Sequence, residues 1–213
     1  MNMTDELTGL PPLAERVVSD VDTLKALSDP VRLRILETMV QAPDDAWTVK
    51  RLASALDVGP TKLYHHIAVL EERELIRIAG TRVVSGIIET SYRIAQLSVR
   101  LDRSLLSAGP AGEAAMAIEE VLRTVFDAAR DDVATALRNG EMRVGEHSPS
   151  GGQGILRQDL RRLSPARAVE LRTRLLAVLD EFDAGPDDPD GVPYGLLLAL
   201  YPVADSARER TDD

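Results

Sequence analysis

The sequence contains no cysteine. Disulfide bonds and thiolate metal sites are therefore excluded, and the composition fits a protein from a reducing cytosol. Histidine is also scarce, with 3 in the chain, at His65, His66 and His147. His65 and His66 would lie about 100° apart on a helix, so they cannot converge on one ion as an i, i+4 pair would. We therefore expect neither a metal site nor a cofactor.

Long hydrophobic runs are absent as well. The longest apolar stretch, Gly195–Tyr201, is far shorter than the ~20 residues that a membrane span requires. The beginning of the chain is polar with scattered acids, and it has no apolar region of the kind that a signal peptide carries. These features predict a soluble, cytoplasmic protein that does not enter a membrane.

The chain as a whole lacks the excess of basic residues that is usual in a nucleic-acid-binding protein. There are 25 basic and 35 acidic side chains among 213 residues, which give a net charge of −10. Residues 46–93 differ, because seven basic residues stand there against five acidic ones. A mildly basic segment on an acidic body should bind random DNA weakly, since phosphate neutralisation supplies nearly all non-specific affinity.

The most informative pattern is a pair of short helices joined by a tight turn. The segment 48–57 has one apolar face and is followed by a break, and Pro60 suits the first turn of the next helix. Leu63, Ile67 and Leu70 share one side of that second helix. Such a pair forms a helix-turn-helix, in which the second helix lies in the major groove of DNA. Similar pairs also occur in ordinary α-helical domains.

The opposite side of the second helix carries side chains that suit contact with DNA. Thr61 and His65 lie there, flanked by Lys62 and Tyr64, and we expect these four residues to read or position bases. His65 can equally be a solvated histidine, and Tyr64 can equally cover the edge of the core. His66 falls at the edge of the packed face, where we expect a structural hydrogen bond or a phosphate contact.

A β-hairpin is predicted after the second helix. Residues 75–94 contain runs rich in β-branched and aromatic side chains, which favour strands. The turn lies either at residues 79–81 or at Ser85-Gly86, and we favour the latter because it leaves arms of similar length. This hairpin would be the wing of a winged helix-turn-helix. Phosphate contacts are expected from three arginines on the first helix and the wing, namely Arg51, Arg77 and Arg82.

Two runs of this sequence resemble a known family. The segment Leu24–Leu36, with its Asp-Pro and Arg-x-x-Ile-Leu motifs, is similar to the first helices of ArsR-like winged helix-turn-helix regulators, and residues 63–76 resemble their recognition helix and its exit. The similarity covers residues 20–95. It implies a DNA-binding transcriptional regulator, usually a homodimer that responds to a metal, another small molecule or a cell state. His66 matches a histidine that is often present in the recognition helix of this family.

The rest of the chain predicts a second unit. We expect a helical connection at Ala95–Ala108 and a long amphipathic helix at residues 111–138, which would span about 40 Å. A helix that starts at Ser164-Pro165, a strand at 155–160 and a buried strand at 194–201 would complete a small α+β body. The segment 194–201 is short enough to be a buried helix turn instead. The long helix either forms a dimer interface or is buried against its own C-terminal elements.

These elements predict a mainly α-helical protein with small β elements, in which a winged helix-turn-helix precedes a helical or α+β C-terminal domain. The expected divisions are an N-terminal arm at 1–18, the DNA-binding domain at 19–95, a C-terminal domain at 96–203 and a disordered tail at 204–213. The C-terminal domain either serves dimerisation alone or also binds a small hydrophobic effector in an apolar cavity.

We predict a sequence-specific transcriptional regulator that binds a pseudo-palindromic operator in double-stranded DNA as a homodimer, with control by a small non-metal ligand as a further hypothesis. An enzyme is not expected, because neither a Ser/His/Asp constellation nor a phosphate-binding loop is evident in the sequence. The alternative function is a winged-helix adaptor that binds protein instead of DNA. The net charge of −10 keeps that alternative open.

Overall fold

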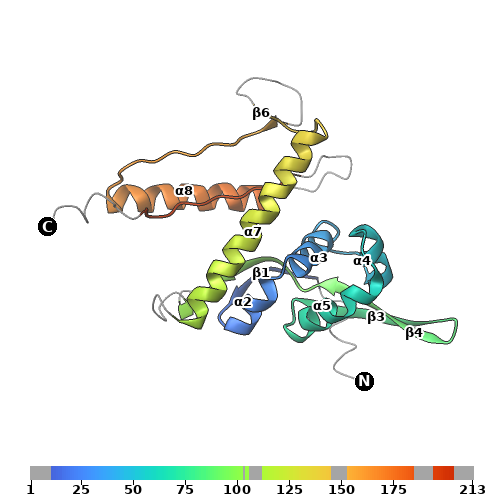
Figure 1. Ribbon diagram of the computed structural model, residues 1–213. Coiled ribbons are helices and arrows are strands. Elements are labelled where there is room, and N and C mark those ends of the chain that lie inside the picture. The colour runs from blue at the N-terminus through green and yellow to red at the C-terminus, as the bar shows by residue number, and fades with distance from the viewer. Residues whose placement is uncertain (1–10, 103, 106–111, 145–152, 185–193, 204–213) are drawn as a thin grey trace. The chain divides into compact units, whose positions relative to one another are not determined.

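The computed structural model describes residues 11–102, 104–105, 112–144, 153–184 and 194–203 (Figure 1). The chain divides into two compact units, Met1–Ala128 and Ala129–Asp213. In the described residues the elements are mainly α-helices with small β-sheets, which confirms the predicted fold class. The predicted tail at 204–213 lies outside these residues.

The helices of the first unit begin at capped positions. After strand β1 (Leu13–Val18), the helices α2 (Val21–Leu27), α3 (Pro30–Val40), α4 (Val49–Ala55) and α5 (Pro60–Glu72) follow. The side chains of Asp20, Asp29 and Thr48 each accept a hydrogen bond from a backbone N–H in the first turn of the helix that follows. Pro30 and Pro60 occupy first-turn positions, where a missing N–H costs nothing.

One face of α5 packs into the core of the first unit. Leu63, Ile67 and Leu70 are 0%, 2% and 0% exposed, which confirms the packed side predicted from the sequence. Full burial of an aliphatic side chain of this size stabilises the fold by about 1.5–3 kcal/mol. The three residues together therefore fix the inner face of α5 firmly and leave its outer face to solvent.

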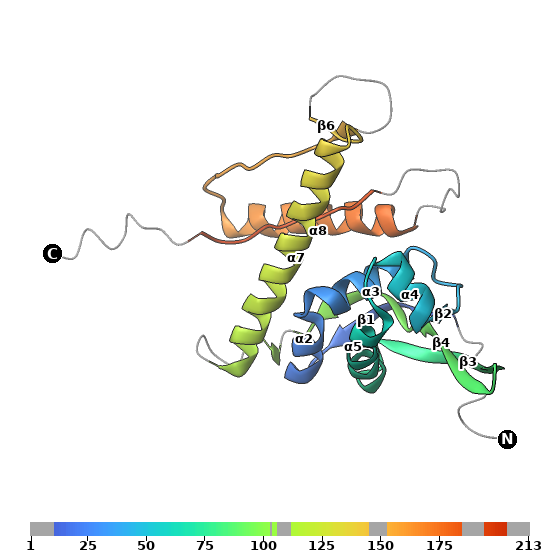
Figure 2. The ribbon, with the colours of Figure 1, turned by 45° about the vertical axis from the view of Figure 1, so that its right-hand side comes forward.

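The predicted hairpin is present. Strands β2 (Trp47–Thr48), β3 (Ile76–Val84) and β4 (Ile87–Ile94) form an antiparallel sheet in the order β2-β4-β3. Ser85 and Gly86 connect β3 to β4 with φ values of 51° and 80°, the left-handed conformations that a two-residue type I′ turn requires. The turn that we favoured is therefore confirmed. The β3–β4 hairpin extends away from the helices (Figures 1 and 2).

The helical connection predicted at Ala95–Ala108 is wrong in its first half. Residues Gln96–Leu101 form strand β5, which pairs in parallel with β1 so that Leu13 lies opposite Gln96 and Val18 opposite Leu101. The alternation of apolar and polar residues in this segment has the two-residue period of a strand. Its partner is the end of the segment that we expected to be an arm, about 80 residues earlier in the sequence, and pairing over that separation gives no local signal.

The long helix is confirmed as α7 (Glu113–Arg138), and its first half packs in the first unit. Ala117 and Thr124 on its inner face are buried. The hydroxyl of Thr124 donates a hydrogen bond of 2.7 Å to the backbone carbonyl of Ser28, which directly follows α2. The part of α7 in the first unit is therefore covered by its own chain on one side.

The second unit contains the end of α7, the short parallel strands β6 (Arg143–Val144) and β7 (Gln153–Gly154), and α8 (Pro165–Ala184). The helix predicted from Ser164-Pro165 is confirmed. The strands predicted at 155–160 and 194–201 are wrong, because both segments are unpaired. Their apolar side chains are exposed, Ile155 by 95%. A short apolar run does not by itself supply the hydrogen-bonding neighbour that a strand needs.

Candidate nucleic-acid interface

The outer face of α5 presents four of the predicted site residues together. Thr61, Lys62, Tyr64 and His65 all have exposed side chains in the first two turns of the helix. Tyr64 is 62% exposed, so it does not cover the core in the way that the alternative interpretation required. The four side chains supply a hydroxyl, an ammonium, a phenol and an imidazole, which can hydrogen-bond to base edges and phosphates.

His66 lies in a different environment from its neighbour. Its side chain is half-buried, and Nδ1 lies 3.4 Å from Oδ1 of Asp29. The same Asp29 oxygen accepts hydrogen bonds from the backbone N–H groups of Val31 and Arg32, at 2.9 Å and 3.0 Å. His66 therefore contacts the carboxylate that caps α3. From this position the His66 side chain can help to orient α5, and it is less well placed than His65 to contact a base.

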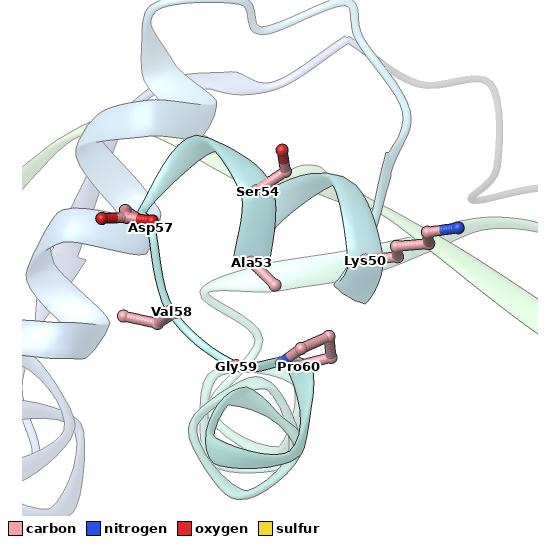
Figure 3. Close-up of a pocket in the computed structure, with 7 residues that line it drawn as sticks. All are labelled: Lys50, Ala53, Ser54, Asp57, Val58, Gly59 and Pro60. Atoms are coloured by element: carbon pink, nitrogen blue, oxygen red, sulfur yellow. The ribbon is translucent and has the colours of Figure 1, made fainter.

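A cavity of about 480 Å³ lies at the turn between α4 and α5. Figure 3 shows Lys50, Ala53 and Ser54 from α4 and Pro60 from α5 around it. Gly59 is the N-cap of α5, and no side chain caps that helix end. A helix N-terminus carries a partial positive charge and donor N–H groups, and Lys50, which also lines the cavity, carries a full positive charge. This part of the surface suits the phosphate backbone of DNA.

A second cavity, of about 390 Å³, brings two of the predicted phosphate-binding arginines together. Arg51 from α4 and Arg82 from β3 both line it, together with Thr48, Thr81 and Ser91. These residues come from α4, from Thr48 directly before it, and from the β3–β4 hairpin. The sequence predicted a role for each arginine separately, and the sheet places them at one cavity.

Both arginines at this cavity already have acidic partners. The Arg51 guanidinium lies 2.5 Å from the Asp45 carboxylate, and it stacks on the Trp47 ring at 3.9 Å from the ring centroid. Arg82 lies 2.6 Å from the Glu89 carboxylate on the neighbouring strand. Exposed ion pairs of this kind contribute about 0–1 kcal/mol. A phosphate can therefore displace these carboxylates, although they reduce the positive charge that it meets.

Arg77 is not part of this arrangement. It is half-buried at the base of β3 and lies directly opposite Arg93 of β4. Burial, and then the neighbouring positive charge of Arg93, lower the pKa of Arg77 below its ordinary value. Like charges opposite each other are destabilising in an antiparallel sheet.

Lys50 and Ser54 were not among the residues that we selected from the sequence. Both lie on α4, whose first turn also contains Arg51. The available signal was the position of Lys50 beside Arg51 at the start of the first helix, the end that faces the DNA backbone in a helix-turn-helix. The structure adds them to the candidate interface.

The fold and this surface define a winged helix-turn-helix. Residues 27–79 match a family of proteins described as helix-turn-helix domain. The match runs from the end of α2 into β3, so it contains α3, α4 and α5 completely. The segment is therefore a helix-turn-helix domain, and the match confirms the resemblance that the sequence motifs carried.

A solved structure described as a possible transcriptional regulator from Methanosarcina mazei Go1 is similar to this chain with 15% sequence identity and a TM-score of 0.31. The alignment covers 54% of this chain and 81% of the other. A likeness at this level carries no argument about function. Among curated proteins, none matches the sequence significantly.

The part of the chain that the structure describes contains neither a membrane span nor a cluster of metal ligands. None of its helices is long and apolar enough to cross a membrane. Within the same residues, no group of three or more histidine, aspartate or glutamate side chains could hold a metal ion.

Proposed function

We propose that the protein is a sequence-specific DNA-binding transcriptional regulator. The main support for this proposal is the outer face of α5. Its inner face is buried in the core, and the outer face exposes four polar side chains together, those of Thr61, Lys62, Tyr64 and His65. The match of residues 27–79 to helix-turn-helix domains supports the same function. In this class of domain, the exposed side chains of the second helix contact base edges in the major groove.

The proposed docking places α5 in the major groove and α4 across the phosphate backbone. Lys50 and Arg51, in the first turn of α4, would then contact phosphates on one side of the groove. Arg82 at the wing would contact the backbone after exchanging the Glu89 carboxylate for a phosphate oxygen. His66 would set the orientation of α5 through Asp29.

The proposal includes a homodimer on a pseudo-palindromic operator. Two recognition helices would enter successive major grooves, about 10–10.5 base pairs apart. The exposed side of α7 supports a self-association surface, because Leu122 and Phe126 are 51% and 48% exposed and adjacent apolar side chains in solvent mark interaction sites.

A small hydrophobic effector of the second unit is part of the proposal, and a thermal-shift screen that finds no stabilising molecule would count against it.

Replacement of Lys62 by alanine tests the docking. One contact to a base or a phosphate contributes about 1–3 kcal/mol, so binding of a selected operator should weaken by about tenfold or more, as measured by fluorescence anisotropy. The thermal unfolding midpoint should stay unchanged, because Lys62 is exposed. Lys25→Ala, a change of an exposed lysine on α2, is the matched control and should bind like the wild type. Unchanged affinity of Lys62→Ala would contradict the docking.

The salt dependence of binding tests the electrostatics of the same docking. Few phosphate contacts are expected for each subunit, because the chain carries a net charge of −10 and the cavity arginines have acidic partners. The logarithm of the binding constant should therefore fall gently with the logarithm of the salt concentration. A slope that corresponds to about ten released ions would show a much more extensive backbone contact than we propose.

A winged-helix adaptor that binds protein is the second candidate function. The pairing of Arg51 with Asp45 and of Arg82 with Glu89 favours it, because these carboxylates offset the charges that would attract DNA. An adaptor should show no preference for one DNA sequence over another, even at low salt. A regulator should select one family of sequences.

A further inference from the structure

The tip of the β3–β4 hairpin is apolar and exposed. Val83, Val84, Ile87 and Ile88, which we call the wing tip, have exposed fractions of 73%, 43%, 72% and 70%. No charged residue stands between Arg82 and Glu89 in the sequence. Clusters of exposed apolar side chains mark interaction sites. The wing tip is therefore a candidate interaction surface, and the phosphate contacts proposed above do not use it.

The wing tip is apolar on both faces of the hairpin. Val83 lies opposite Ile88, and Val84 lies opposite Ile87. Because successive residues of a strand point to opposite faces, each face of the tip carries one aliphatic pair. A flat partner surface would cover only one of these pairs. A slot that closes around the hairpin would cover both.

We propose that the wing tip is an apolar wedge that enters the minor groove of DNA beside the recognition site and partly unstacks a base step there. This inference rests on the proposed DNA-binding function. Proteins that bind the minor groove insert aliphatic side chains between base steps in this way and kink the duplex. The β-branched side chains of the tip are stiff, so little side-chain entropy is lost on insertion.

The position of the hairpin supports DNA as the occupant. Strand β3 starts four residues after the end of α5, so the wing is continuous with the candidate interface. The nine residues of β3 extend over about 30 Å at ~3.3 Å per residue. The minor groove adjacent to an occupied major groove lies about half a helical turn away, roughly 17 Å. The hairpin is long enough to reach it.

The tip carries no charge that phosphates would repel, and its shape suits a groove. Arg82 and Glu89 form an ion pair at the neck of the tip, so the negative charge of Glu89 is offset there until Arg82 turns to a phosphate as proposed above. The turn at the leading end consists of Ser85 and Gly86, and a Cβ at Gly86 would meet nothing within 4 Å. Serine has a small side chain and glycine has none, so the end of the hairpin is narrow. The aliphatic pairs behind it widen the hairpin in the manner of a wedge.

The double variant V84T/I87T tests the wedge. Threonine keeps the high strand propensity of these positions and replaces apolar surface by a hydroxyl. The probe is a duplex recovered by selection with the wild-type protein, carrying dyes at both ends and 2-aminopurine at the flanking steps. Wild-type binding should bend this duplex by tens of degrees, within about 20–90°, and should raise the 2-aminopurine fluorescence. The variant should lose both signals, bind about tenfold more weakly and keep the same salt slope, because no charge changes.

Val169→Thr on α8 is the matched control, because Val169 is 57% exposed outside the wing. It should bend DNA like the wild type.

Equal bending and affinity of V84T/I87T and the wild type would overturn the wedge while leaving sequence-specific binding intact. A wild-type complex with straight DNA and unchanged 2-aminopurine fluorescence would also overturn it. Loss of self-association by V84T/I87T in sedimentation, on unbent DNA, would assign the tip to a second copy instead. Failure of the wild type to select any duplex would refute the proposed function itself.

Discussion

Replacement of Thr124 by valine should destabilise the first unit. The Thr124 hydroxyl is buried and donates a hydrogen bond of 2.7 Å to the Ser28 carbonyl. Valine preserves the volume of the side chain and removes only this donor. A hydrogen bond of this kind contributes about 0.5–1.5 kcal/mol, and a buried carbonyl left without a partner costs about 1–3 kcal/mol. Ser28 is only half-buried, so water can reach its carbonyl in part, and we expect a loss of about 1–2 kcal/mol.

Urea unfolding followed by tryptophan fluorescence measures this loss. The chain has 1 tryptophan, Trp47, which is 7% exposed in the core of the first unit, so its emission reports the unfolding of that unit. The midpoint should shift to lower urea concentration with an unchanged slope. Thr173→Val on α8 is the matched control, because the Thr173 hydroxyl donates to the Val169 carbonyl in an exposed position. The control should lie within about 0.5 kcal/mol of the wild type.

The result bears on how α7 is connected to the DNA-binding face. Ser28 precedes Asp29, which caps α3 and lies 3.4 Å from the His66 ring on α5. The hydrogen bond from Thr124 therefore joins α7 to the residues that orient the recognition helix. Equal stability of Thr124→Val and the wild type would refute the packing of α7 described above.

Two further effects should follow from the helix caps. Asp29→Ala should destabilise the first unit by about 1–2 kcal/mol in the same urea assay, because two N–H groups of α3 lose their acceptor, whereas Asp29→Asn should retain most of that stability. Burial alone would raise the pKa of Asp20, but hydrogen bonds from Thr23 and the charges of Arg73 and Arg16 outweigh it and lower that pKa below its ordinary value of 3.8. The stability from ionised Asp20 is thus fully present well above pH 3.8 and is lost as the pH falls through and below that value. Asp20→Asn, which caps equally well but does not titrate, should make the urea midpoint less dependent on pH there, and an unchanged pH dependence would contradict the assignment.

The parts of the fold that the sequence predicted are those with strong local periodicity. The apolar residues of α5 recur at helical spacing, and Asp29, Thr48 and Pro60 stand at helix starts, so these boundaries followed from caps and faces. The wing followed from its β-branched runs and from a turn that needs a glycine. These signals lie within a few residues of the elements that they define.

The parts that were missed depend on partners far away in the sequence. Strand β5 forms because β1 offers it a ladder, and the apolar run at 194–201 lies unpaired in the structure. The candidate site shows the same limit. The sequence placed Arg51 and Arg82 on separate elements, but only the sheet register puts Arg82 opposite Glu89 and both arginines at one cavity.

Selection of bound sequences from random duplex DNA tests the central claim most directly. Wild-type protein should enrich one palindromic motif with half-sites about 10–10.5 base pairs apart. His65→Ala and Lys62→Ala, selected in parallel, should lose or relax that motif, because both side chains lie on the exposed face of α5. A folded wild-type protein that enriches no sequence would contradict the account and favour the adaptor.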